Sequence, residues 1–193
     1  MIGDFDAIVL AGGRGSRLGA PSKPDLLVGG RRLLDIALAA VAAARKVVVV
    51  GPVVVPDGVL RTREDPPFGG PVAGVDAGFT ALPAHAPWTL LLACDLPGAE
   101  LAVRQLLSAE PEPEHDGVCL LDAGGRRQWL LGCYRSPALA GRLGDRGVPP
   151  LTAMYRLLEP LNLLGVPAFA GCVDDVDTPA DVAHWVATLE TER

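Results

Sequence analysis

The stretch LAGGRGSRLGAPSKPD, from Leu10 to Asp25, directly follows the apolar run Ala7–Leu10. It holds four glycines and three basic residues, Arg14, Arg17 and Lys23. Glycines let the backbone approach a ligand closely, and successive N–H groups in such a turn form a concave anion site. A strand that ends in this loop predicts an α/β fold with a polyphosphate bound at the strand end. The alternative is a surface turn with solvated basic side chains.

Two common phosphate-binding patterns do not fit this loop. The Walker A pattern requires a Gly-Lys pair followed by Ser or Thr, and the loop contains no Gly-Lys pair. In the dinucleotide pattern G-x-G-x-x-G, Gly13 and Gly15 match. Leu18 occupies the third position, and the next glycine, Gly19, comes one residue late. An NAD-dependent oxidoreductase is therefore disfavoured.

Short β-branched runs alternate with Ala- and Leu-rich helical patterns along the chain. The expected strands are 6–11, 47–50, 59–62, 88–93, 118–121, 129–134 and 168–173. The expected helices are 33–44, 72–82, 99–108, two short ones within 137–164, and 179–191. This alternation predicts one domain over residues 1–193, with a three-layer Rossmann-like α/β fold and a mostly parallel central sheet.

Ligands of such open sheets bind beyond the carboxyl ends of the strands. That rule selects four segments, 11–23, 63–74, 94–97 and 173–178, which hold most of the unusual chemistry of the chain. Because these segments are far apart in sequence, their meeting at one sheet edge is a strong structural expectation.

Composition narrows the function classes. The 17 basic and 23 acidic side chains give a net charge of -6, which argues against a general binder of nucleic acid or membrane surfaces. The four cysteines form no C-x-x-C pair, which favours reduced thiols over a zinc site or disulfide framework. The segment MIGDFDAIVL lacks the basic start of a signal peptide, and no apolar run is long enough to span a membrane. We expect a soluble, cytoplasmic protein.

Four motifs, in order, resemble a known family. LAGGRGSRLGAPSK resembles the nucleotidyltransferase signature L-A-G-G-x-x-x-R-[ML]-G followed by a lysine. GGPVAG (residues 69–74) is similar to the G-P-L-A-G of molybdenum cofactor guanylyltransferases of the MobA type. CDLP and DDVDTPADV resemble two further motifs of that family, so the resemblance spans Ile8 to Trp185. It implies a glycosyltransferase-A-type α/β fold and transfer of a nucleotide from a triphosphate to a phosphorylated acceptor, with release of pyrophosphate.

The reaction that this resemblance implies is transfer of GMP from GTP to molybdenum-carrying molybdopterin. Contacts with other proteins of molybdenum cofactor biosynthesis are implied as well. Asp175 and Asp177 replace two asparagines of the motif, as in cytidylyltransferase relatives, so CTP and other phosphorylated acceptors remain alternatives. An alternative of a different class is a nucleotide-binding regulatory domain without catalysis.

Carboxylates near the strand ends are candidate ligands of Mg²⁺, which prefers oxygen donors. Asp95 directly follows the buried run WTLLLA and is expected to project at the carboxyl edge of the sheet. Asp177 is the expected second ligand, and Asp175 a third choice. Asp95 and Asp177 each have an alternative role as a helix cap, because a proline or threonine follows closely.

Lys23 and Arg17 are the expected partners of the phosphates, and we expect Lys23, Arg17 and Asp95 to act in catalysis. The resemblance implies that Lys23 contacts the triphosphate and stabilises the charge that develops at the α-phosphate. Lysine offers a compact charge, and arginine grips two oxygens. The further nucleotide-binding residues expected are Leu10, Ala11, Gly12, Gly13, Asp65 and Gly70. Asp65 would accept hydrogen bonds from the N1–H and N2–H₂ groups of guanine, but it could equally be an exposed loop carboxylate. The alternative for Lys23 is a solvated surface lysine.

A phosphate monoester acceptor already carries a nucleophilic oxyanion at pH 7, so no general base is required. The three histidines lie outside all four candidate segments, which agrees with that chemistry. Arg126, Arg127 and Gln128 are candidates for the acceptor side, with a solvated hairpin turn as the alternative.

Overall fold

The computed structural model of the chain describes residues 1–12, 23–144 and 151–191. Within these residues the strands are β1 (Phe5–Leu10), β2 (Leu27–Val28), β3 (Arg31–Arg32), β4 (Val47–Val50), β5 (Leu60–Thr62), β6 (Trp88–Ala93), β7 (Gly117–Leu121), β8 (Arg127–Arg135) and β9 (Leu163–Pro167). The helices are the 3₁₀ turn η1 (Lys23–Asp25), α1 (Leu33–Ala40), α2 (Pro71–Thr80), α3 (Ala99–Ser108), α4 (Ser136–Gly144), α5 (Met154–Leu158) and α6 (Pro179–Thr191).

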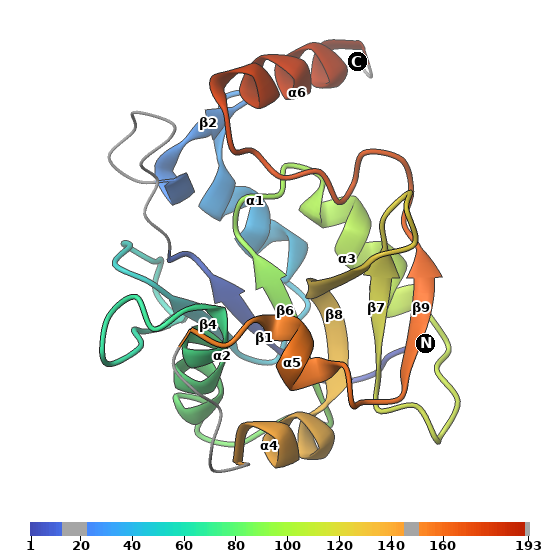
Figure 1. Ribbon diagram of the computed structural model, residues 1–193. Coiled ribbons are helices and arrows are strands. Elements are labelled where there is room, and N and C mark those ends of the chain that lie inside the picture. The colour runs from blue at the N-terminus through green and yellow to red at the C-terminus, as the bar shows by residue number, and fades with distance from the viewer. Residues whose placement is uncertain (13–22, 145–150, 192–193) are drawn as a thin grey trace.

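Seven of the described strands form the central sheet, in the order β5-β4-β1-β6-β8-β7-β9 (Figure 1). β1, β4, β5 and β6 run parallel to one another, and β7 is parallel to β9. β8 is antiparallel to both β6 and β7. β2 and β3 form a separate two-stranded ribbon. The expected mostly parallel α/β sheet is confirmed.

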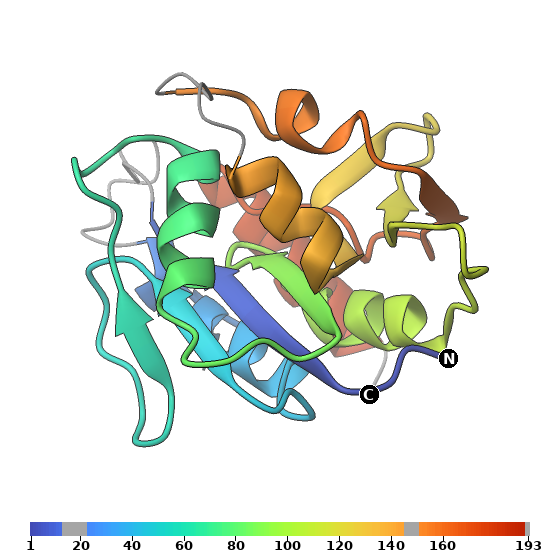
Figure 2. The same ribbon diagram turned by 90° about the horizontal axis from the view of Figure 1, so that it is seen from below.

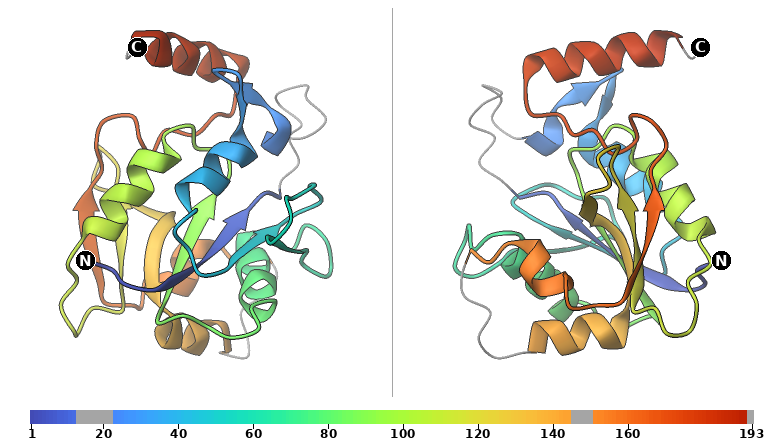
Figure 3. Two further views of the ribbon diagram at one scale, coloured as in Figure 1. Left: turned by 180° about the vertical axis from the view of Figure 1, so that it is seen from behind. Right: turned by 45° about the vertical axis from the view of Figure 1, so that its right-hand side comes forward.

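Helices cover both faces of the sheet, which gives three layers (Figures 2 and 3). α1 and α3 lie on one face, and α2, α4 and α5 lie on the other. Each face has its own cluster of buried apolar side chains, one centred on Val9, Leu90 and Leu92 and the other on Ile8 and Leu91. Adjacent strand residues point to opposite faces, so an uninterrupted apolar run supplies both clusters at once.

The expected strand over 168–173 is wrong. The last strand is β9, five residues earlier, and 168–173 turns away from the sheet. The side-chain amide of Gln105 binds the backbone at this point: its Nε2 donates to the carbonyl of Pro167, and its Oε1 accepts from the N–H of Phe169. A side chain thus satisfies two backbone groups at the end of the edge strand β9, while the N–H of Ala168 still donates to the carbonyl of Leu121 in β7. The turned segment packs on the start of α3, where a Cβ at Gly98 would lie 2.7 Å from the Cα of Cys172.

None of the helices in the described ranges combines the length and the apolar character needed to cross a bilayer.

Close packing of α2 on the sheet depends on Gly78. A Cβ built on this helical glycine would lie 2.5 Å from Cγ2 of Ile8 and 3.0 Å from Cγ2 of Val50, both on stiff β-branched side chains. We expect Gly78→Ala to lower the free energy of unfolding by about 1–3 kcal/mol, as overpacking does. The matched control is Gly141→Ala in α4, where a Cβ meets nothing within 4 Å and the substitution is expected to be neutral or stabilising. Urea unfolding of both variants is the measurement, and equal stabilities would contradict the account of this contact.

Candidate functional site

Three parallel strands end side by side and define one edge of the sheet. The N–H of Ala11 donates to the carbonyl of Val50 (2.8 Å), and the N–H of Cys94 donates to the carbonyl of Leu10 (3.1 Å). These bonds extend the pairing of β1 with β4 and β6 one residue past the strand ends. The chain segments that follow β1 and β6 therefore leave the sheet next to each other.

Lys23 and two aspartates meet at this edge. The Nζ of Lys23, at the start of η1, donates to Oδ2 of Asp95 at 2.7 Å and to Oδ1 of Asp177 at 2.6 Å. The Lys23 side chain is only 17% exposed, against 24% for Asp95 and 52% for Asp177. The two aspartates lie 72 and 154 residues from Lys23 in sequence. The expectation that these charged groups share one site is thus fulfilled by the fold.

The segment that carries Asp177 is tied directly to Asp95. The N–H of Val176 donates to the carbonyl of Asp95 (3.0 Å), and the Val176 side chain is fully buried. Asp181 fixes the other end, since its Oδ2 accepts from the N–H of Asp177 (2.9 Å) and of Thr178 (2.7 Å). Asp181 thereby closes the capping box that begins α6. The carboxylate of Asp177 is positioned from both sides.

Asp175 completes an acidic cluster. One carboxylate oxygen each from Asp95, Asp175 and Asp177 lie within 4.8 Å of one another. Burial raises the pKa of Asp175, and the charges of Asp177 and Asp95 raise it further. For Lys23, burial lowers the pKa, but the hydrogen bonds to Asp177 and Asp95 outweigh it and the pKa lies above its ordinary value. Within the part of the chain that the structure describes, this group of three carboxylates is bonded by one ammonium group, through Asp95 and Asp177, which leaves negative charge for a further cation.

Two cavities open on either side of Asp95. The smaller cavity, of about 610 Å³, is lined by residues from the ends of β1 and β4, by Lys23, and by the segment that leads into α2. The larger cavity, of about 890 Å³, lies toward β8 and the segment 168–175. Ala93, Asp95 and Leu130 line both cavities. Both volumes are within the range of small-molecule sites.

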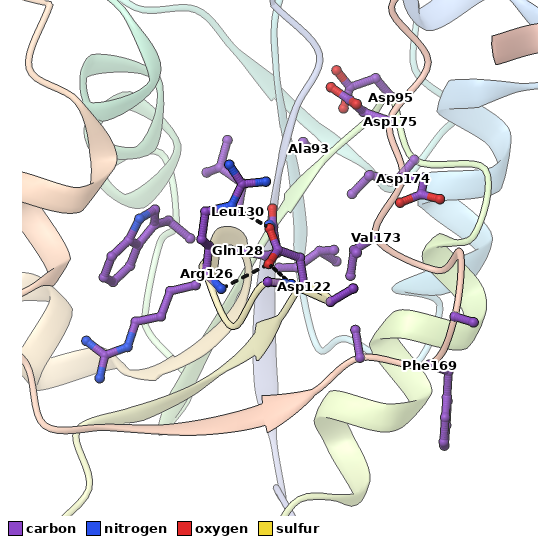
Figure 4. Close-up of a pocket in the computed structure, with 18 of the residues that line it drawn as sticks. Ala93, Asp95, Asp122, Arg126, Gln128, Leu130, Phe169, Val173, Asp174 and Asp175 are labelled. Carbon is purple, nitrogen blue, oxygen red and sulfur yellow. Dashed lines mark hydrogen bonds and ion pairs between the residues drawn. The ribbon is translucent and has the colours of Figure 1, made fainter.

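The far wall of the larger cavity is the hairpin between β7 and β8 (Figure 4). Asp122 orders this turn, because its carboxylate accepts from the N–H groups of Gly124 and Arg126, from Nε of Arg126 and from Nε2 of Gln128. These bonds also hold the pKa of Asp122 below its ordinary value. In Figure 4, Asp95 and Asp175 lie side by side at one end of the cavity, away from the Asp122 cluster. Arg126 therefore lies in the turn, Arg127 and Gln128 begin β8, and all three line the cavity.

The structure brings most of the predicted nucleotide-binding residues to the smaller cavity. Leu10, Gly12, Lys23, Gly70 and Asp95 line it. Ala11 is buried behind the cavity wall, and Asp65 is exposed and is not among the lining residues. Gly13 and Arg17 lie outside the described residues.

Among the residues that line this cavity and that sequence reasoning missed are Glu64, Phe68 and Leu151. The sequence did offer a signal for Phe68, because it is an aromatic residue directly before the paired glycines of GGPVAG. No pattern in the sequence pointed to Leu151.

Cys94 lies in the wall of the smaller cavity but is not a nucleophile. Burial raises the pKa of its thiol to about 12, with a further contribution from the Asp95 carboxylate. The thiolate is the reactive form of cysteine, so this side chain stays neutral and acts as a small apolar wall residue.

Comparisons with known proteins agree with this arrangement. Residues 7–161 match the family model described as the MobA-like NTP transferase domain. A probable molybdenum cofactor guanylyltransferase of Bacillus thuringiensis (strain Al Hakam) is 29% identical over 198 residues, covering 98% of this chain and 92% of that protein.

Two solved structures are similar in fold. Molybdopterin-guanine dinucleotide biosynthesis protein A from Archaeoglobus fulgidus has a TM-score of 0.71 at 17% identity, covering 96% of this chain and 99% of its own. The 2-C-methyl-D-erythritol 4-phosphate cytidylyltransferase from Thermus thermophilus has a TM-score of 0.65 at 19% identity, covering 97% of this chain and 99% of its own. The fold is that of nucleotidyltransferases, and with the family match over residues 7–161 the chain belongs to the MobA-like NTP transferase family of enzymes.

Proposed function

We propose that this enzyme transfers GMP from GTP to molybdenum-carrying molybdopterin, forming the guanine dinucleotide cofactor and pyrophosphate. Family membership supports nucleotidyl transfer, and the name of the Bacillus relative supports this acceptor and nucleotide. The observation that carries the proposal is the pair of cavities that meet at Asp95, beside the ammonium group of Lys23.

In this proposal GTP occupies the smaller cavity, with its base toward the segment 64–70 and its phosphates toward Lys23 and Gly12. The acceptor occupies the larger cavity, between the β7–β8 hairpin and the segment 168–175. The α-phosphate then lies at the boundary that Asp95 shares with both cavities. Because the acceptor oxygen would approach the α-phosphorus from the larger cavity while the leaving pyrophosphate lies in the smaller one, the arrangement suits an in-line displacement.

The chemical step needs positioning and charge neutralisation. An oxygen of the acceptor phosphate attacks the α-phosphorus, the bond from that phosphorus to the oxygen bridging the β-phosphate breaks, and pyrophosphate leaves with the bonding electron pair. No proton is transferred, since the attacking oxygen is already ionised at neutral pH. Lys23 stabilises the negative charge on the phosphates, and Arg17, which follows the same strand, is proposed to assist it.

The acidic cluster fits a divalent cation. Its three donors are carboxylate oxygens, the ligands that Mg²⁺ prefers, and they already attract the Lys23 ammonium group. We propose Asp95 and Asp177 as the Mg²⁺ ligands, with Asp175 beside them. The bound ion would neutralise phosphate charge and help to align the reacting groups.

We propose that the loop before α2 determines which nucleotide base the enzyme accepts. The exposed Asp65 remains the proposed partner of the guanine N1–H and N2–H₂ groups. Its neighbour Glu64 lines the cavity and, with its Oε1, also accepts from the N–H of Phe68 (3.0 Å). CTP is the second candidate, since Asp175 and Asp177 match cytidylyltransferase relatives and a solved cytidylyltransferase shares the fold.

Nucleotide binding is tested first by thermal unfolding with each of the four triphosphates and Mg²⁺. At about 100 times its dissociation constant, GTP is expected to raise the melting temperature by roughly 5–10 °C, and CTP by less. Pyrophosphate release is then measured with GTP and freshly prepared molybdenum-molybdopterin. Release with CTP in place of GTP would correct the base assignment, and no release with any triphosphate would refute the reaction.

A further inference from the structure

Two large apolar side chains remain exposed at the mouth of the smaller cavity. Phe68 is 51% exposed and Leu151 is 74% exposed, although both line the cavity. Surface apolar residues are common singly, but a pair at the rim of one cavity marks a surface suited to an apolar ligand group. The two residues are far apart in sequence, so the fold brings them together.

Both residues have an unfavourable backbone conformation. The φ angle is +66° at Phe68 and +63° at Leu151, the only positive values at non-glycine residues within the described ranges. The left-handed region is disfavoured for residues with a Cβ, and bulky residues rarely adopt it. Such strain persists where the surroundings impose it, and it concentrates at functional sites. Its occurrence twice, at one cavity mouth, points to a role there.

Hydrogen bonds hold both strained residues in place. The N–H of Phe68 donates to Oε1 of Glu64 at 3.0 Å, and the N–H of Leu151 donates to the carbonyl of Gly69 at 3.1 Å. The second bond links the two segments directly. Gly70 has a φ of +92°, which favours glycine, and a Cβ built on it would lie in van der Waals contact with the Cα of Leu151, at 3.4 Å.

Arg63 supports the aromatic ring. Its guanidinium carbon lies 5.3 Å from the centre of the Phe68 ring, within cation–π range. The ring is therefore oriented before any ligand arrives, which lowers the entropy that binding would otherwise lose.

We propose that Phe68 and Leu151 form an apolar clamp that packs against the base of the bound nucleotide. This inference rests on the proposed nucleotide binding in the smaller cavity. Stacking on an aromatic ring tolerates any base, so the clamp adds affinity for the nucleoside part while polar groups select the base. The clamp therefore contributes nothing to binding of a phosphate chain that lacks a base.

The test measures the affinity of the full chain for GTP and for inorganic tripolyphosphate, both with Mg²⁺, by titration calorimetry. Phe68→Ala is expected to weaken GTP binding about tenfold through the loss of base stacking, and Leu151→Ala to weaken it by a similar factor through the loss of apolar contact. Both variants are expected to leave tripolyphosphate binding unchanged. Phe68→Trp is expected to retain GTP affinity. Leu101→Ala is the matched control, because Leu101 is 40% exposed on α3 and lines neither cavity.

A second variant separates the ring from the fold of the loop. Phe68→Gly accepts a φ of +66° without strain, so it removes the ring from a loop that keeps its conformation. The GTP affinity of Phe68→Gly is expected to fall as much as that of Phe68→Ala. Its melting temperature is expected to be no lower than that of Phe68→Ala. Equal loss of GTP and tripolyphosphate affinity in the alanine variants, or unchanged GTP affinity, would overturn the clamp and leave the proposed function intact. Failure of the unmodified protein to bind any triphosphate would instead overturn the proposed function.

Discussion

Asp95→Asn is expected to lower the rate of nucleotidyl transfer about a thousandfold, at the upper end of what a single electrostatic group contributes. Asp95 combines three features: it lines both cavities, it accepts from Lys23 at 2.7 Å, and it belongs to the acidic cluster. The asparagine side chain keeps the shape but loses the charge, so its amide oxygen is a weaker ligand for a divalent cation and a weaker acceptor for Lys23. The loss therefore falls on alignment of the phosphates rather than on folding.

Single-turnover pyrophosphate release, with GTP and acceptor both saturating, is the appropriate measurement. Asp57→Asn is the matched control, since Asp57 is an exposed carboxylate in the loop before β5 and lines neither cavity. A rate within about threefold of the unmodified enzyme, for a folded Asp95→Asn protein, would remove Asp95 from the site, because the expected loss is far larger.

Lys23→Gln is expected to produce two opposite effects. Transfer is expected to fall about 10²–10³-fold, because a preorganised positive charge near the phosphates is lost. Affinity for a divalent ion in the absence of nucleotide is expected to rise, because the ammonium group that bridges Asp95 and Asp177 no longer competes for their carboxylates. In the unliganded protein Lys23 thus occupies the position of a counter-ion, and it becomes available to the phosphates once another cation neutralises the aspartates.

Electron paramagnetic resonance of Mn²⁺ titrated into the protein measures the second effect without turnover. The chain contains only two lysines, so Lys46→Gln is a natural control. Lys46 is exposed, and its carbonyl accepts from the N–H of Ala7, toward the opposite end of β1. Weaker Mn²⁺ binding by Lys23→Gln would show that the lysine organises the aspartates instead of competing for them.

Much of the fold could be predicted from the sequence because its strands are unusually apolar. Val47–Val50 and Trp88–Ala93 are continuous runs of strand length, almost wholly apolar, and their predicted bounds agree with β4 and β6. The failures occur where side chains from elsewhere decide the outcome. β9 ends where its partner β7 ends, and Gln105 of α3 binds the backbone that follows, so the segment 168–173 carries no local signal of this outcome.

For the candidate site, too, some residues could be predicted from the local sequence and others could not. The rule that ligands bind at the carboxyl ends of parallel strands was enough to predict that Lys23 and Asp95 lie together, as the structure has them. Asp177 joins them although the strand expected over 168–173 does not form, because the N–H of Val176 donates to the carbonyl of Asp95 and holds the segment there. Leu151 could not be predicted in this way, because it reaches the smaller cavity through a backbone hydrogen bond to Gly69, formed between two loops. Glu64 rather than Asp65 lines the cavity, and in a loop no periodicity tells which of two adjacent residues turns inward.

The most direct test of the central claim is a crystal structure of the enzyme with Mg²⁺ and a GTP analogue whose α,β-bridging oxygen is replaced by a methylene group. The account predicts the base in the smaller cavity against Phe68, the phosphates within hydrogen-bond reach of Lys23, and the metal ion on Asp95 and Asp177. An analogue bound in the larger cavity, or anywhere with Lys23 and Asp95 still paired to each other and remote from every phosphate, would contradict it.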